Sequence, residues 1–315
     1  MTAAAADVRI RSLRPPRRVV DPYQAHGSVL EVERRPHGRI EQAFTLFASG
    51  AECPFTCSFC DLWQWAIDGP TPSGALSQQV ERALESLGAS QPDRFKFYNA
   101  SNFFDKRAVP LDDTVRIAEL TRAFAGVTVE SHASTIGPAV LAFAERIGGR
   151  LEVAMGLETI HPVAMGHLNK RLDLTRFDAA ARMLSEHDID LRVFVLLGAP
   201  YVPSSESIDW TRRTVAYAVE RGAALVSIIP VRGGNGELER LQSLGHFAPP
   251  TLRDLEQALE ANADMSPAVI TADLWDAERL AGCDACRDAR VERIRQMNMT
   301  GVLAPCVVCA VCAGS

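Results

Sequence analysis

Cysteine is absent from the long middle of this chain. Of the eight cysteines, three lie between residues 53 and 60, and the other five lie at or after residue 283. A framework of structural disulfides would be spread more evenly, so this distribution points away from a disulfide-stapled secreted domain. No recognisable signal peptide is present either. We therefore expect a reducing, cytoplasmic location in which the cysteines bind metals.

Two further absences narrow the class of protein. No apolar run approaches the roughly 18 residues that a membrane-spanning helix needs, so no membrane partner is expected. An excess of basic charge is also missing, because the formal net charge is −6, and this argues against general binding of polyanions. The chain is, however, long and rich in apolar residues. Its 315 residues, 47% of them hydrophobic, can bury the core of one domain of α/β-barrel size with extensions.

One basic segment stands at the N-terminus. Before Asp21 the only acid is Asp7, and the arginines are Arg9, Arg11, Arg14, Arg17 and Arg18. For residues 1–39 we predict a partly disordered arm, with contact to RNA or to an acidic partner as the alternative.

The most informative motif is the stretch from Gly50 to Asp61, which reads GAECPFTCSFCD. It holds Cys53, Cys57 and Cys60, with the aromatic Phe59 directly before the last. Iron–sulfur clusters normally take four cysteines, so three at this spacing would leave one iron of a [4Fe-4S] cluster open to a substrate or cofactor. The alternative is a structural zinc knuckle or three unrelated thiols. Zinc sites usually close with a second cysteine pair, and none lies nearby in the sequence.

This motif resembles the signature of the radical S-adenosylmethionine (SAM) superfamily, Cys-x3-Cys-x2-Cys with an aromatic residue before the third cysteine. The context agrees, because an apolar run at 45–49 precedes the loop and a helical pattern at 75–87 follows it. The resemblance implies a [4Fe-4S] cluster whose open iron binds SAM. It also implies reductive cleavage of SAM to a 5′-deoxyadenosyl radical that abstracts hydrogen from a substrate, with a reductant such as flavodoxin or ferredoxin as partner.

Alternating strand-like and helix-like patterns predict parallel βα units. Six units are too few to close an eight-stranded barrel, so we expect an open partial (β/α)6 barrel at residues 40–235, the form of radical SAM cores. Residues 236–315 would form a cysteine-rich C-terminal extension. Active groups then belong at the C-terminal ends of the strands. The expected strands are 44–48, 95–99, 127–131, 151–155, 191–197 and 224–229.

Polar residues at these strand ends form the expected SAM site. They resemble the SAM-binding set of the anaerobic coproporphyrinogen dehydrogenase and elongator catalytic-subunit branch, in which an acid in a Gly-x-Glu motif and a later basic residue contact the ribose and the methionine carboxylate. Charge favours this, since a cation suits the carboxylate and acids suit the ammonium and hydroxyls. For each residue the alternative is an ordinary ion pair or turn. The candidates are Phe59, Asn99, Ser101, Glu130, Glu158, Lys170 and Arg192.

Asn99 and Ser101 stand where many radical SAM enzymes carry a Gly-Gly-Glu-like motif, so the sequence departs from the family there. The runs CDLW, FYNASNFFD and GLET indicate the elongator-like branch, and there is a weaker resemblance to the radical SAM subunit of archaeosine synthase. This leaves RNA, a small molecule or a peptide as the substrate, although the chain lacks the basic excess of a tRNA binder. The competing interpretation is a non-catalytic iron–sulfur or zinc module that binds RNA or transfers electrons.

The tail carries a separate metal signal, Cys283-x2-Cys286 followed by Cys306-x2-Cys309-x2-Cys312. Two Cys-x2-Cys pairs at this separation match a zinc ribbon, but a fifth cysteine does not. Radical SAM enzymes often carry auxiliary clusters at their C-termini. A second [4Fe-4S] cluster is therefore favoured over zinc, and which four of the five thiols bind stays open.

Overall fold

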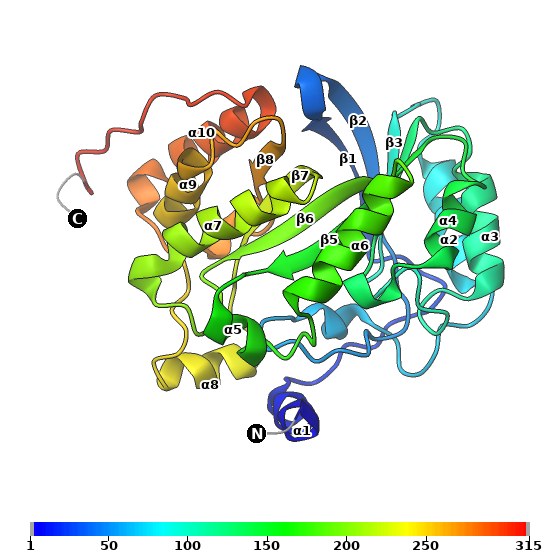
Figure 1. Cartoon of the computed structure of the whole chain (residues 1–315), viewed down its shortest axis with the longest axis horizontal. Coiled ribbons are helices and arrows are strands. Elements are labelled where there is room, and N and C mark those ends of the chain that lie inside the picture. The colour runs from blue at the N-terminus through cyan, green and yellow to red at the C-terminus, as the bar shows by residue number, and fades with distance from the viewer. Residues whose placement is uncertain (1–2, 313–315) are drawn as a thin grey trace.

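The structure is a computed structural model that describes residues 3–312. In this part of the chain, eight strands form one sheet that curls into an open half-barrel (Figure 1). They lie in chain order, with β1 antiparallel to β2 and all later neighbours parallel. The strands are β1 (Gly27–Arg34), β2 (Ile40–Phe47), β3 (Arg94–Tyr98), β4 (Gly126–Glu130), β5 (Arg150–Glu158), β6 (Asp190–Leu197), β7 (Ala223–Pro230) and β8 (Val269–Ala272).

The expected partial barrel is confirmed, and each of the six expected strands is present as β2 to β7. The two edge strands were missed. β1 leaves Leu30 and Val32 exposed and has no continuous apolar run, as is common for a strand paired on one side only. β8 has four residues and pairs with β7, so the sheet continues beyond residue 235, where only an extension was expected.

Helices cover the outer face of the sheet. Side chains that alternate along the strands, such as Phe95, Phe97 and Val127, are fully buried in one apolar cluster with Leu76 and Ile117 from helices. The intervening positions face the inside of the half-barrel. The helices are α1 (Ala3–Leu13), α2 (Ala75–Ser86), α3 (Leu111–Leu120), α4 (Pro138–Ala144), α5 (Pro162–His167), α6 (Leu174–Glu186), α7 (Ser207–Glu220), α8 (Glu237–Ser243), α9 (Leu252–Ala261) and α10 (Arg287–Thr300).

α10 joins the two free edges of the half-barrel. Its Asn298 side chain accepts a hydrogen bond from the Ala272 N–H of β8 and donates one to the Ala272 carbonyl, both at 2.8 Å. The Arg34 guanidinium of β1 donates to the Asn298 carbonyl at 3.1 Å. One asparagine therefore links both edge strands, and the C-terminal segment is an integral part of the fold.

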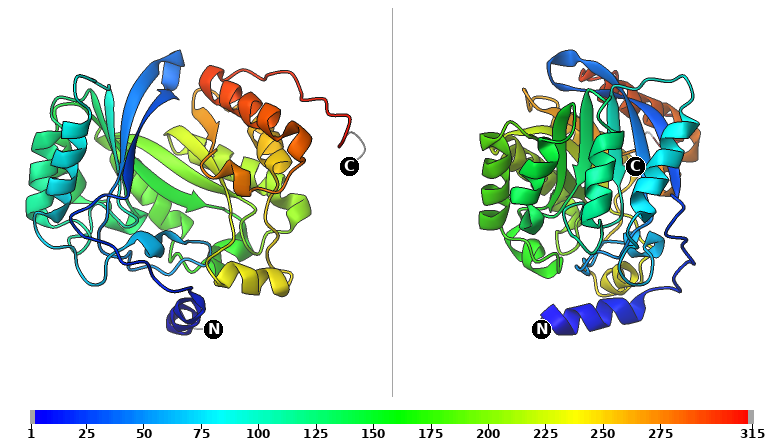
Figure 2. Two further views of the ribbon diagram at one scale, coloured as in Figure 1. Left: turned by 180° about the vertical axis from the view of Figure 1, so that it is seen from behind. Right: turned by 90° about the vertical axis from the view of Figure 1, so that its right-hand side faces the viewer.

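The N-terminal arm is folded against the domain, in contrast to the partly disordered segment that the sequence suggested. α1 lies beneath one end of the half-barrel, beside the loops there (Figure 2). Arg9 on α1 forms an ion pair of 2.8 Å with Glu237 of α8, and Arg14 forms one of 2.8 Å with Glu52. Three of the five arginines of this segment, Arg9, Arg14 and Arg17, thus pair with acids of the domain. Among the helices of residues 3–312, none combines the length and apolar content of a membrane span.

Candidate active site

The three-cysteine loop lies at the C-terminal edge of the parallel sheet. Loops that follow three other strands hold it there. After β3, the Asn102 amide donates to the Cys53 sulfur at 3.6 Å. After β5, the Leu168 carbonyl accepts from the Ser58 N–H at 2.9 Å, and after β7, the Asn235 amide donates to the Ser58 carbonyl at 3.0 Å. The loop is therefore positioned by long-range contacts at the edge where α/β barrels carry their active groups.

Burial governs the pKa values of the three thiols. Burial raises the pKa of Cys53 and Cys60, and it raises the pKa of Cys57 to about 12. A nearby Lys170 opposes this rise at Cys53 and Cys57. Thiols in such surroundings stay protonated alone, but a bound metal deprotonates its thiol ligands outright. The donor set, three thiols of one loop with a lysine ammonium nearby, fits an iron–sulfur cluster.

Glu158 and Lys170, predicted as SAM contacts, meet beside these cysteines. The Lys170 ammonium lies 2.6 Å from the Glu158 carboxylate and 6.0 Å from the centre of the Phe59 ring. Burial would lower the pKa of Lys170, but Glu158 and the thiols raise it overall. The site therefore combines a firmly cationic ammonium with a buried carboxylate.

A glycine makes room for this pair. The β5–β6 pairing shifts register between Gly156 and Glu158, and Glu158 takes a left-handed backbone φ of 68°. A Cβ atom on Gly156 would lie 2.0 Å from the Glu158 carboxylate and 2.5 Å from the Lys170 ammonium. The Gly-x-Glu motif thus has a steric explanation, because any side chain at Gly156 would displace both charged groups.

Asn99, Ser101 and Glu130 gather at the neighbouring strand ends. The Glu130 carboxylate accepts the Asn99 backbone N–H at 3.0 Å, and burial raises the pKa of Glu130 to about 7. The Asn99 side-chain amide and the Ser101 hydroxyl are buried and have no hydrogen-bond partner among residues 3–312. Buried polar groups are normally satisfied, so these atoms fit a polar ligand.

Asn102 and His132, which the sequence prediction did not select, also belong to the site. Asn102 donates to Cys53, and its carbonyl oxygen accepts the backbone N–H of His132 at 2.8 Å. The His132 ring lies 4.2 Å from the ring of Phe55, which stands between Cys53 and Cys57 in the loop. The mostly polar residues 99–102, which follow β3, were the sequence signal for this part of the site. The sequence does not specify which of their amide side chains faces the cysteine loop.

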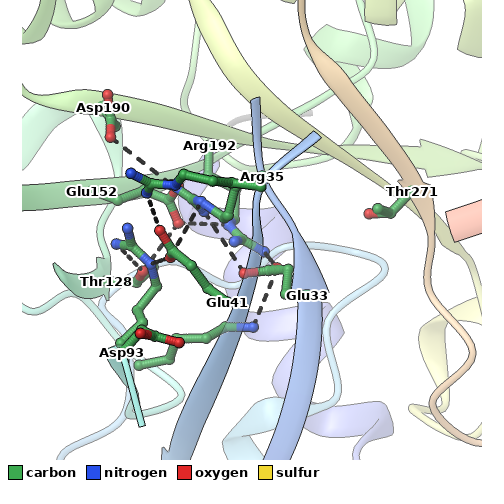
Figure 3. Close-up of polar contacts among 12 residues, drawn as sticks. Glu33, Arg35, Glu41, Asp93, Thr128, Glu152, Asp190, Arg192 and Thr271 are labelled. Carbon is green, nitrogen blue, oxygen red and sulfur yellow. Dashed lines mark hydrogen bonds and ion pairs between the residues drawn. The ribbon is translucent and has the colours of Figure 1, made fainter. Parts of the chain in front are cut away.

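Arg192 lies elsewhere, which corrects its assignment to the SAM site. It is near the start of β6 and points into the half-barrel (Figure 3). There it forms ion pairs of 2.6 Å with Glu33 and 2.8 Å with Glu152, and Arg35 pairs with the other Glu152 oxygen at 2.6 Å. Its position in the predicted strand suggested a contact with SAM. Its side chain instead forms its ion pairs within this buried network.

The N-terminal helix touches the site through Asp7. Its carboxylate accepts hydrogen bonds from Thr56 in the cysteine loop and, at 2.8 Å, from the Asn169 amide, and it pairs with Arg171. Burial would raise the pKa of Asp7, but these partners lower it overall. Asp7 therefore joins the segment that carries Cys57 to the segment that carries Lys170.

The C-terminal cysteines form a second group, in a different part of the molecule. The ligand sulfurs of Cys283, Cys286, Cys309 and Cys312 all lie within 4.8 Å of one another. Cys306 is exposed and outside this group. The structure thus brings together four of the five thiols.

Comparison with known proteins identifies the fold. No family model and no curated protein matches the chain. An archaeal Elp3 from Methanocaldococcus infernus, with residues 1–46 deleted, superposes with a TM-score of 0.52 at 13% identity, over 70% of this chain and 59% of that one. A radical SAM methyltransferase from Sphaerobacter thermophilus gives 0.51 at 16% identity, over 74% and 68%. A mutant spore photoproduct lyase with a dinucleoside spore photoproduct gives 0.51 at 11% identity, over 71% and 74%.

These structural relatives are radical SAM enzymes, and Elp3 represents the elongator-like branch. At such low identities the similarity establishes the fold, which is the radical SAM half-barrel that the cysteine motif predicted. The match covers 59% of the length of the Elp3 structure.

Proposed function

We propose that this protein is a radical SAM enzyme in which Cys53, Cys57 and Cys60 bind a [4Fe-4S] cluster and SAM completes the coordination of the open iron. When bound, the cluster supplies the electron that cleaves SAM into methionine and a 5′-deoxyadenosyl radical. One observation carries the proposal. A three-thiol loop lies at the C-terminal edge of a radical SAM half-barrel, beside a buried carboxylate–ammonium pair and buried polar atoms without partners among the described residues.

The protein side chains have separate tasks in this proposal. Lys170 has three N–H donors and gives one to Glu158, so two remain for the methionine carboxylate. Glu158 accepts hydrogen bonds from the ribose hydroxyls. The Asn99 and Ser101 side chains, together with Glu130, face the methionine ammonium. Each contact joins groups of opposite charge or a charged and a neutral polar group, and charge-assisted hydrogen bonds are the stronger kind.

The substrate proposal follows from the elongator-like motifs and the structural similarity to Elp3. We propose hydrogen abstraction in the modification of a nucleobase in RNA, with a small molecule as the alternative. The reaction needs a low-potential electron donor such as flavodoxin or ferredoxin. In the cytoplasm, the location we propose, the protein would meet both its substrate and this donor. Neither the substrate nor the partner alters the expected first step, which is reductive cleavage of SAM.

That first step is tested by anaerobic reconstitution with iron and sulfide, followed by dithionite and SAM. We expect 5′-deoxyadenosine and methionine in the mass spectrum. The variant with Cys53, Cys57 and Cys60 all replaced by Ala should produce neither. Cys306→Ala is a matched control, because it removes an exposed thiol outside both cysteine groups. An iron-loaded protein that makes no 5′-deoxyadenosine would be a binding module, and activity in the triple variant would refute the proposed ligands.

A further inference from the structure

The four C-terminal thiols have the spacing of a site for a single metal ion. The sulfur of Cys283 lies 4.0 Å from that of Cys309, and the sulfur of Cys286 lies 3.8 Å from that of Cys312. Tetrahedral zinc with bonds of about 2.3 Å to sulfur places its ligands about 3.8 Å apart. A disulfide would require about 2.05 Å. The observed distances therefore match the edges of a tetrahedron of thiolates.

An iron–sulfur cubane needs a wider arrangement. Each cysteine of a [4Fe-4S] cluster binds its own iron at an outer corner, so the sulfurs surround the whole cubane. Four sulfurs that all lie within 4.8 Å of one another leave room at their centre for one ion. This geometry opposes the auxiliary cluster that the sequence favoured.

The fold decides which cysteine is left out. The Arg293 guanidinium on α10 donates to the carbonyls of Ala304, at 2.6 Å, and Pro305, at 2.8 Å. These bonds fix the tail along the helix and hold Cys306 beside Arg293, with its sulfur 3.8 Å from the guanidinium. The tail then returns toward the start of α10, where Cys309 and Cys312 meet the other pair. Cys306 is therefore not a ligand of this site.

The surroundings of the four sulfurs suit a negatively charged tetrathiolate centre. Cys286 directly precedes the first residue of α10, whose N-terminus carries partial positive charge. The Arg290 guanidinium donates to the Cys286 sulfur at 3.3 Å, and Glu256 on α9 holds the same arginine by an ion pair. Partners that orient and neutralise the ligands in this way are typical of metal sites.

We infer that Cys283, Cys286, Cys309 and Cys312 bind one Zn²⁺ ion in a closed structural site, independent of the SAM-binding loop. Tetrahedral sites with four sulfurs take zinc or iron. Four protein ligands leave no open position, which is the pattern of structural zinc. The ion ties residues 309–312 to the start of α10 and thereby fixes a tail whose Val308 and Val311 are exposed.

The test uses the full-length protein and measures zinc and iron per chain by mass spectrometry. We expect one zinc ion in the wild-type protein and none in the Cys309→Ser/Cys312→Ser double variant, while iron in the reconstituted Cys53 loop stays unchanged. Cys306→Ser is the matched control and should keep its zinc. Because the double variant changes only partly exposed tail residues, circular dichroism should show an intact fold. X-ray absorption should show four sulfurs at about 2.3 Å from zinc.

Several outcomes would overturn the inference. Iron that is lost together with Cys309 and Cys312 would establish a cluster or a single iron site. Zinc lost in Cys306→Ser would mean that the ligand set is wrong, and a wild-type protein without zinc at this site would refute it altogether. Failure of SAM cleavage alone leaves the zinc result unchanged, so the two proposals fail separately.

Discussion

Glu158→Gln tests whether the carboxylate–ammonium pair serves SAM or only the fold. The substitution preserves shape and removes the charge that faces Lys170 at 2.6 Å. Losing a hydrogen bond to a charged group costs about 1.5 to 3 kcal/mol. Since about 1.4 kcal/mol is tenfold in affinity, SAM binding should weaken roughly 10- to 150-fold.

The assay is equilibrium binding of SAM to the anaerobically reconstituted protein, with iron content and thermal stability measured on the same sample. Glu81→Gln is the matched control, because it breaks an exposed ion pair with Arg116 that is worth at most about 1 kcal/mol. Gly156→Ala should give a similar loss of affinity, since its Cβ would occupy the space of both charged groups. Wild-type affinity in Glu158→Gln with full iron content would show that the pair is purely structural.

Three further predictions concern the surroundings of the site. Asp7→Ala removes the carboxylate that bridges Thr56, Asn169 and Arg171, while the direct Asn169–Thr56 bonds remain, and should speed the release of cluster iron to a chelator. Because burial raises the pKa of Glu130 from its ordinary value of 4.5 to about 7, SAM affinity should rise as the pH increases through the higher value. Stability should fall as the pH rises between the two values, where the folded state still holds a proton that the unfolded chain has lost, and Glu130→Gln should abolish both trends. Arg192→Met leaves Glu152 buried without this ion pair and should cost about 3 to 5 kcal/mol in thermal unfolding, with SAM affinity unchanged. Equal loss of SAM affinity in Arg192→Met would contradict its placement away from the site.

Features that depend on short residue spacings were predictable from the sequence. Alternating βα patterns predicted β2 to β7 and the open barrel, because strand and helix periods are local properties of the chain. The Cys53 loop was recognisable for the same reason, since its three cysteines lie a few residues apart. Glu158 and Lys170 were found together because Glu158 ends β5 and Lys170 follows it closely, with a single short helix, α5, between them.

Contacts between distant segments required the tertiary structure. Glu158 and Arg192 both looked like charged residues near strand ends, yet one lies beside the cysteines and the other pairs with Glu33 across the half-barrel. The sequence shows five C-terminal cysteines but does not specify which four of their thiols come together. That choice is made by Arg293, whose bonds to the tail carbonyls turn Cys306 away. In each case the deciding partner is distant in sequence, or a backbone atom that residue spacing does not specify, so only the folded chain could identify it.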